Sequence, residues 1–280
     1  MKILFKLSIL SCIPFLFACS PSLVNEHPVK HTTGEDVPLS EDEIKEILSK
    51  EYKVMFIGNS FTYYNDIDKI TESIGKDLGM KITCEKVAVG SHHLYEHAQS
   101  DDETGKIIEQ KLQTNSYTHV ILQEHSTYPV SNYTKFLEGA TQLKQKINQY
   151  QPKADIRLYE TWGFQSMADS YTTSKSIPDA EQLLFEKYRE CANELSLKVH
   201  YVGKGFTKAY QEYKNINLYN AEDSKHPSYM GTYLASLIHI ASLTGLDVRT
   251  CNYNGNANEE NATVLKSVAY ETVKKYGVNP

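Results

Sequence analysis

Ser60 is a candidate nucleophile because of the chain around it. The four residues 54–57 are apolar and predict a buried parallel strand, which Gly58 and Asn59 end. Ser60 would then lie at the carboxyl end of a strand, where open α/β sheets bind their ligands. A serine on such a strand-to-helix turn can expose its Oγ and keep its backbone N–H free for an oxyanion. The alternative for this segment alone is an ordinary serine turn or helix cap.

A base that could activate Ser60 lies far along the chain, in the stretch Asp-Ser-Lys-His-Pro at 223–227. This stretch immediately precedes an amphipathic helical pattern over 229–243. The proline keeps His226 extended, and the carboxylate of Asp223 can reach the imidazole Nδ1. The other ring nitrogen then faces the strand ends. These are the base and orienting carboxylate of a nucleophilic triad, although the pattern alone also fits a helix cap beside a surface histidine.

Two separated blocks resemble the SGNH (GDSL-type) hydrolases. The first is Gly-Asn-Ser-Phe-Thr at 58–62, and the second begins Asp-x-x-His-Pro-Ser at 223 and ends Gly-x-Tyr-Leu-Ala at 235. With Leu-Gln-Glu at 122–124, the blocks are similar to a bacterial, lipoprotein-like group of that superfamily. The resemblance covers about residues 53–250. It implies a flavodoxin-like three-layer α/β/α sandwich with a parallel five-stranded sheet, and ester hydrolysis without a metal or other cofactor.

The resemblance also implies roles for individual residues. Ser60 matches the nucleophile, His226 the general base and Asp223 its orienting carboxylate. The oxyanion hole would use the N–H of Ser60, the N–H of Gly90 and a side-chain amide after the third strand. The family usually has asparagine there, whereas this chain has Gln123, whose amide is one methylene further out. Gln123 as a structural amide at the strand end is the alternative.

A different pattern, His93-x-x-Glu96-His97, fits inverted zinc metallopeptidases. Two histidines four apart on a helix share a face and could bind zinc, with the glutamate as base. The segment directly follows the expected strand-end glycine, however, and no further ligand motif accompanies it. We therefore expect no metal site. We interpret His97 as a residue that either faces the pocket or packs in the interior.

Aromatic residues suggest where a substrate would lie. Trp162 and Phe164 begin the long connection 162–177 after the fourth strand, so they are candidates to line the substrate pocket. Their alternative role is a hydrophobic lid without a part in specificity. The 20 tyrosines could include a platform for sugar rings, or could serve only in packing.

The chain that positions these residues alternates strand and helix patterns, which predicts one domain over 40–280 with a parallel sheet. A capping box at Ser40–Glu43 predicts a short helix to Lys50. After the first strand, further strands are predicted at 81–87, 119–122, 155–160 and 198–202. Helices are predicted at 66–78, 104–112, 136–150, 180–195, 229–243 and 259–276.

The first 19 residues predict a lipoprotein signal peptide. Lys2 and Lys6 precede an apolar run over 7–17, which is too short for a membrane span. Leu-Phe-Ala-Cys ending at Cys19 resembles a bacterial lipobox, so Cys19 would carry the lipid; a plain secretory signal is the alternative. Ser20, rather than aspartate, follows the cysteine, and by resemblance to sorted bacterial lipoproteins this implies the outer membrane of the cell envelope. Residues 20–39 read as a flexible tether.

Charge and cysteines narrow the remaining possibilities. A formal charge of −6 without a basic stripe argues against a nucleic-acid partner. Outside the signal segment, Cys84, Cys191 and Cys251 are odd in number and have no paired spacing. One disulfide among them is possible, and the sequence does not choose a pair.

These observations lead us to expect a lipid-anchored serine esterase that removes acyl groups, in particular acetyl groups, from carbohydrate. The carbohydrate part rests on the expected compartment, the lipid anchor and the resemblance to related lipoproteins, and it leaves lipids, other small esters and peptidoglycan acetyl groups open. An ester-bearing small molecule or glycan would be its substrate, and the membrane would be contacted through Cys19. The first alternative is a non-catalytic lipoprotein that has the same fold and binds glycans. The second, less favoured alternative is the zinc metallopeptidase.

Overall fold

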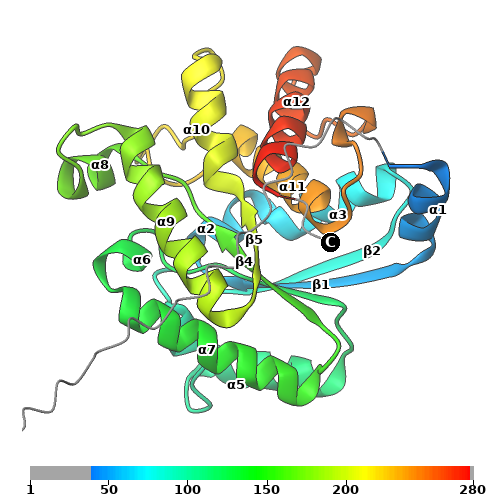
Figure 1. Ribbon diagram of the computed structural model, residues 1–280, viewed down its shortest axis with the longest axis vertical. Coiled ribbons are helices and arrows are strands. Elements are labelled where there is room, and N and C mark those ends of the chain that lie inside the picture. Colours follow the sequence, from blue (N-terminus) through cyan, green and yellow to red (C-terminus); the bar gives the residue numbers. More distant parts are fainter. Residues whose placement is uncertain (1–38, 278–280) are drawn as a thin grey trace, which may run out of the picture. The chain divides into compact units, whose positions relative to one another are not determined.

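The computed structural model describes residues 39–277, and five parallel strands form its central sheet (Figure 1). They are β1 (Glu51–Gly58), β2 (Lys81–Ala88), β3 (His119–Leu122), β4 (Asp155–Glu160) and β5 (Lys198–Tyr201). Their order across the sheet is β2-β1-β3-β4-β5. The chain therefore moves to one side of β1 for β2 and to the other for β3, and the switch point lies between the carboxyl ends of β1 and β3.

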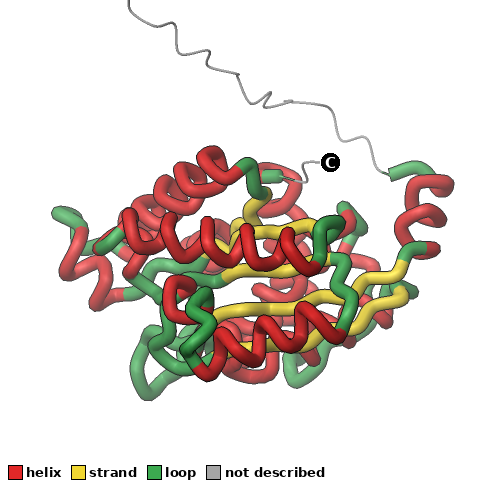
Figure 2. The backbone as a smooth tube through the Cα atoms, turned by 90° about the horizontal axis from the view of Figure 1, so that it is seen from below, coloured by secondary structure: helices red, strands yellow, loops and turns green. Residues whose placement is uncertain are grey.

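Helices cover both faces of this sheet. In chain order they are α1 (Glu41–Ser49), α2 (Ser60–Tyr63), η1 (Tyr64–Asp66), α3 (Ile67–Asp77), α4 (Leu94–His97), α5 (Glu103–Thr114), α6 (Tyr128–Ser131), α7 (Tyr133–Tyr150), α8 (Gln165–Tyr171), α9 (Ile177–Leu195), α10 (Val202–Glu212), α11 (Tyr229–Thr244), η2 (Val248–Thr250) and α12 (Glu259–Tyr276). One layer contains α3, α11 and α12, and the other α5, α7 and α9 (Figures 1 and 2). This confirms the predicted three-layer α/β/α sandwich.

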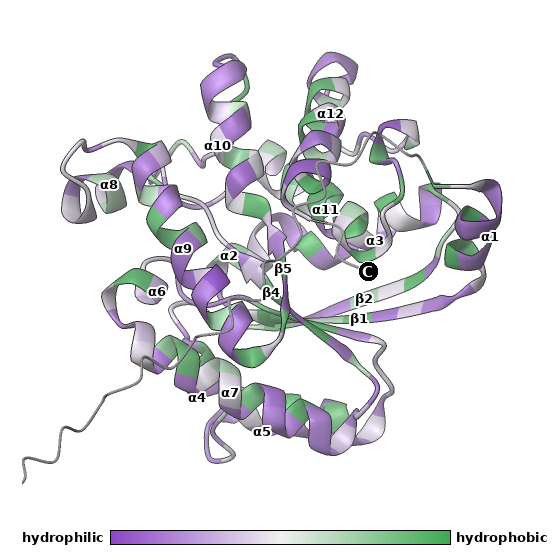
Figure 3. Ribbon diagram, viewed as in Figure 1, coloured by the Kyte–Doolittle hydropathy of each residue, from purple (hydrophilic) through white to green (hydrophobic). Residues whose placement is uncertain are grey.

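Helix α11 is the central helix of its layer. Every residue from Gly231 to Thr244 is buried, which explains why it is one of the most hydrophobic helices in Figure 3. Ser228 caps it by accepting a hydrogen bond from the N–H of Gly231. It ends at Gly245, whose φ of 76° lies in the left-handed region that favours glycine. The residues just before α11, which include His226, are therefore attached to a deeply buried element.

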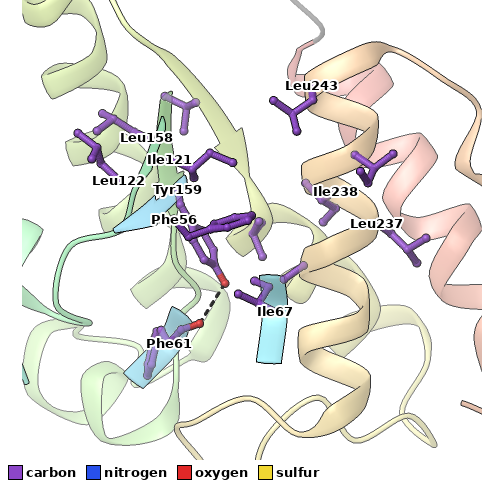
Figure 4. Packing of buried hydrophobic residues seen from close by; sticks show 14 of the residues in the cluster. Phe56, Phe61, Ile67, Ile121, Leu122, Leu158, Tyr159, Leu237, Ile238 and Leu243 are labelled. Atoms are coloured by element: carbon purple, nitrogen blue, oxygen red, sulfur yellow. Dashed lines mark hydrogen bonds between the residues drawn. The ribbon is translucent and has the colours of Figure 1, made fainter. Parts of the chain in front are cut away.

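The hydrophobic core connects the sheet to the turn that carries Ser60 (Figure 4). Phe56 of β1 and Tyr159 of β4 are buried, and both rings meet the ring of His239 of α11 edge-on, at 5.1 and 4.5 Å. The hydroxyl of Tyr159 donates a hydrogen bond of 3.5 Å to the carbonyl of Phe61. Packing in the sheet thus constrains the backbone immediately after the candidate nucleophile.

The structure corrects two predictions about local structure and decides whether a disulfide forms. The connection 162–177 is not a plain loop, because it contains α8, and residue 202 begins α10 rather than ending a strand. The cysteines Cys84, Cys191 and Cys251 are all free and buried, so no disulfide joins them. The predicted signal peptide, with Cys19, and almost all of the tether lie outside the described residues. Within 39–277, no helix is both long and apolar enough to cross a membrane.

Candidate active site

The turn after β1 presents Ser60 at the switch point. Asn59 caps α2: its Oδ1 accepts a hydrogen bond of 3.3 Å from the N–H of Phe61. Its Nδ2 donates to the carbonyl of His92, 3.0 Å away, which ties the turn to the segment after β2. Ser60 is the first residue of α2. An N–H at this position points out of the helix without an intrahelical acceptor, as an oxyanion hole requires.

The structure brings Ser60, His226 and Asp223 together. His226 Nε2 lies 2.8 Å from Ser60 Oγ, although 166 positions separate the two residues. Nδ1 of the same ring lies 2.5 Å from Asp223 Oδ2. An ionised carboxylate can only accept, so Nδ1 carries the hydrogen and Nε2 is left to accept the hydrogen bond from Ser60 Oγ. This is the connectivity of a nucleophile, a base and an orienting acid.

Asp223 is held in its charged form. Partial burial alone would raise the pKa of its carboxyl group, but hydrogen bonds outweigh that effect and lower the pKa. The strongest of them comes from the His226 side chain, and the backbone N–H groups of Lys225 and His226 each donate to Asp223 Oδ1 over 2.9 Å. The loop is therefore built around the carboxylate, as expected when Asp and His lie three residues apart.

Two aromatic rings from the nucleophile segment support the imidazole. Tyr64 stacks on His226 with ring centroids 4.3 Å apart and an interplanar angle of 6°. Phe61 meets the same ring edge-on at 5.6 Å. Tyr64 was not predicted as a site residue. Nothing in the sequence marks a tyrosine four residues after the serine as a contact of the histidine, because the two segments meet only in the folded protein.

Asn65 connects the same two segments. Its Nδ2 donates to the carbonyl of Pro227 over 3.1 Å and to the Thr232 hydroxyl over 2.9 Å. The residue adopts a φ of 54°, a conformation that asparagine tolerates better than most residues. Asn65 thus fixes the distance between α11 and the turn after β1. It too was missed, although its place directly after the Gly-Asn-Ser-Phe-Thr block is a usable signal.

Gly90 lies where the prediction requires it, just beyond the end of β2. Ala88 pairs with Gly58 across the sheet, and the N–H of Val89 donates to the Gly58 carbonyl over 3.2 Å. A Cβ added at Gly90 would lie 3.2 Å from the Tyr63 hydroxyl, tighter than most such contacts. The segment therefore runs beside the Ser60 turn, and glycine at this position keeps the approach to it open.

Gln123 is fully buried, and its carboxamide contacts the backbone of the nucleophile turn. Its Oε1 accepts hydrogen bonds from the N–H of Asn59 over 3.0 Å and from the Thr62 hydroxyl over 2.8 Å. A backbone N–H can only donate, so this contact fixes the orientation of the amide. The amide nitrogen then donates to the carbonyl of Glu124. These contacts favour the alternative interpretation of Gln123, in which its amide stabilises the turn at the strand end and does not bind the oxyanion.

Trp162 and Phe164 belong to the core and not to an open pocket wall. Their side chains are 0% and 3% exposed. Trp162 is sandwiched between Phe61, at 4.5 Å and 7°, and Phe206, at 4.1 Å and 4°. Its indole N–H donates to the carbonyl of Lys225 over 3.0 Å. The tryptophan therefore acts on the site from beneath, by holding the loop that carries the histidine.

His97 is likewise a packing residue. It is fully buried, with Nε2 2.7 Å from the carbonyl of Gly58 and Nδ1 3.0 Å from the Thr104 hydroxyl. Burial lowers its pKa to about 4, so the ring is neutral at pH 7.

The other two residues of the proposed zinc pattern are His93 and Glu96. His93 lies before the four-residue helix α4, and Glu96 accepts a hydrogen bond from its backbone N–H. Because both nitrogens of His97 are engaged, this set does not fit zinc, and no cluster of three or more metal-binding side chains occurs in residues 39–277.

Similar architectures are found among solved structures. A DUF4886 family protein from Bacteroides uniformis matches with a TM-score of 0.69 at 16% identity, over 80% of this chain and 95% of that one. A proposed SGNH hydrolase from Slackia heliotrinireducens matches at 0.56 and 21%, over 68% and 97%. The lipase/acylhydrolase from Enterococcus faecalis matches at 0.51 and 13%, over 69% and 96%. No family model and no curated protein matches the sequence.

The fold is therefore that of the SGNH hydrolases, as the sequence blocks indicated. On this fold, Ser60, His226 and Asp223 form one hydrogen-bonded chain.

Proposed function

We propose that the protein is a serine esterase that removes acyl groups, in particular acetyl groups, from carbohydrate. The observation that carries the proposal is the unbroken hydrogen-bonded chain from Ser60 through His226 to Asp223. It lies at the switch point of a parallel sheet, where ligands bind in folds of this kind. A module that only bound glycans would not need these three groups in proton-transfer contact.

The mechanism follows from the geometry. His226 takes the Ser60 proton as Oγ attacks the acyl carbonyl, and Asp223 stabilises the imidazolium. The oxyanion that forms is bound by the N–H groups of Ser60 and Gly90. His226 then returns the proton to the leaving alcohol, and water resolves the acyl-enzyme by the same steps. Gln123 contributes by holding the Ser60 turn in place.

A carbohydrate alcohol is supported by the aromatic surface beside the triad. Tyr63 is 37% exposed, and its ring lies 5.5 Å from that of Tyr64, with an interplanar angle of 23°. Tyr64 in turn stacks on His226. An aromatic face next to the nucleophile can pack against the apolar face of a sugar ring.

The envelope location rests on the sequence of the first 19 residues. We propose that the protein is anchored through a lipid on Cys19, in the outer membrane of a bacterial envelope. Metabolic labelling with a radioactive fatty acid tests the anchor: the wild-type chain is expected to incorporate label, and Cys19→Ala is expected not to. Equal labelling of both chains would contradict it.

Hydrolysis of 4-nitrophenyl acetate by the purified protein tests the esterase proposal. Wild type, Ser60→Ala and His226→Ala are compared with and without EDTA. Turnover that survives EDTA and disappears in both variants is expected. Turnover lost with EDTA but retained in Ser60→Ala would overturn the serine mechanism in favour of a metal one. No turnover of this ester or of acetylated glycans by wild type would favour a glycan-binding protein.

A further inference from the structure

Lys225 is a lysine next to the catalytic base, and the charged group that acts on it is Asp223. It directly precedes His226 and is partly buried. Within residues 39–277, its Nζ makes no hydrogen bond and no ion pair; the rings of Phe61 and Phe164 lie 5.9 and 5.4 Å away. Contact with aromatic rings compensates only part of the cost of removing an ammonium group from water. Because Nζ donates no hydrogen bond within the described residues, the ammonium group has N–H groups that an anion could accept from.

The backbone of Lys225 is held from both sides, so its side chain starts from a defined position. Its N–H donates to Asp223 Oδ1 over 2.9 Å, and its carbonyl accepts the indole N–H of Trp162 over 3.0 Å. The preceding Ser224 has a φ of 53°, which turns the chain sharply before the lysine. The same carboxylate that orients His226 therefore also positions Lys225.

His125 lies in the segment that follows β3. It is half-buried, and the electrostatic fields of both Lys225 and His226 act on it. Its ring centroid is 4.9 Å from that of His93. Burial, and then the charges of His93 and Lys225, lower its pKa to about 4, so it is a neutral imidazole with one N–H at pH 7. The charges of Lys225 and His226 thus both reach this neutral ring.

We propose that Lys225 binds a carboxylate carried by the ester substrate. The inference rests on the proposed esterase function and adds the substrate class. The carboxylate has two possible sources: the acyl part, as in a hemiester of a dicarboxylic acid, or the alcohol part, as in an acetylated uronic acid. The net charge of the chain is −6, so attraction of an anionic substrate requires a local cation of this kind.

Matched ester pairs test the proposal and separate the two sources. The acyl pair is mono-4-nitrophenyl succinate against 4-nitrophenyl butyrate, and the alcohol pair is acetylated methyl glucuronoside against acetylated methyl glucoside. Wild type is expected to prefer the charged member of one pair. In Lys225→Met the preference, as a ratio of kcat/KM values, should fall about 10- to 100-fold, the range for one charge-assisted hydrogen bond, mainly through KM. Lys225→Arg should restore part of it.

The control is Lys45→Met on the exposed helix α1, where the lysine side chain is 71% exposed. It removes the same charge and should leave the preference as in wild type. A wild type without preference in either pair, or a preference that Lys225→Met retains, would overturn the proposal.

A binding measurement makes the result independent of turnover. Isothermal titration of wild type with glucuronate and with succinate should show binding of one of them, lost in Lys225→Met and kept in Lys45→Met. If no ester is hydrolysed, the esterase proposal fails while this titration still decides the role of Lys225. Binding of neither anion, or binding unchanged in Lys225→Met, would refute that role.

Discussion

The ring of Tyr64 lies flat against the ring of His226, 4.3 Å away and tilted by only 6°. The base of the proposed triad is therefore held on one side by Asp223 and on its face by a residue of the segment that carries the nucleophile. An imidazole that must move a proton in two directions benefits from a fixed plane. The stack also explains how two segments far apart in the chain share one geometry.

Replacing Tyr64 by alanine is expected to lower kcat/KM for 4-nitrophenyl acetate by about 2- to 10-fold, because aromatic pairs contribute about 0.5–1.5 kcal/mol beyond their buried area. Tyr64→Phe keeps the ring and is the matched control, with activity close to wild type. Equal losses in both variants would assign the effect to the hydroxyl and contradict the stacking role.

Gln123→Leu is expected to destabilise the fold by at least about 2 kcal/mol, since it leaves the buried N–H of Asn59 and the carbonyl of Glu124 without partners. Urea unfolding measures this change. If Gln123 instead served mainly as an oxyanion donor, kcat would fall by about 10²- to 10³-fold with stability nearly unchanged. The two measurements on one variant therefore separate the structural role from the catalytic one.

Trp162→Ala is expected to reduce the free energy of unfolding by about 3–5 kcal/mol, as for other large side chains removed from a core. Trp162→Phe should cost less, because a ring remains between Phe61 and Phe206, while the carbonyl of Lys225 still loses its donor. Thermal unfolding and KM are measured together. A raised KM with unchanged stability in both variants would contradict the packing role and restore Trp162 to the pocket wall.

Acid is expected to destabilise the protein below about pH 6.5. Burial is the first cause that lowers the pKa of His97, His119 and His125 to about 4 and of His239 to about 3. An unfolded chain binds protons on these groups near pH 6.5, so between pH 6.5 and 4 the unfolded state holds more protons than the folded state. Stability is then complete above pH 6.5 and falls as the pH drops, by up to about 1.4 kcal/mol per pH unit for each histidine.

Urea unfolding from pH 7.5 to 4.5 measures that slope. His97→Gln keeps a donor for the carbonyl of Gly58 but cannot take up a proton, so its slope should be smaller than that of wild type by about one proton. A slope that is equal in the two proteins would show that His97 does not contribute.

Much of the fold follows from local sequence patterns. The strands 119–122 and 155–160 and the helix 259–276 have the bounds that were predicted, and the capping box at Ser40 is present. Apolar runs and capping residues act over a few positions, so their effect can be read without the rest of the chain. Helix α10 was missed because Val202 extends the β-prone pattern of β5 and because Gly203 and Gly205, which disfavour a helix, lie in its first turn.

Local patterns along the chain were enough to predict the alternation of strands and helices and the serine, histidine and aspartate that are candidates for a triad. Which side chains share a surface depends on the tertiary structure. It placed Trp162 and His97 in the core, turned the amide of Gln123 toward Asn59, and set Tyr64 against His226. The physical reason is that burial and cross-segment contacts depend on how the helices pack on the sheet, and no spacing along the chain records that packing.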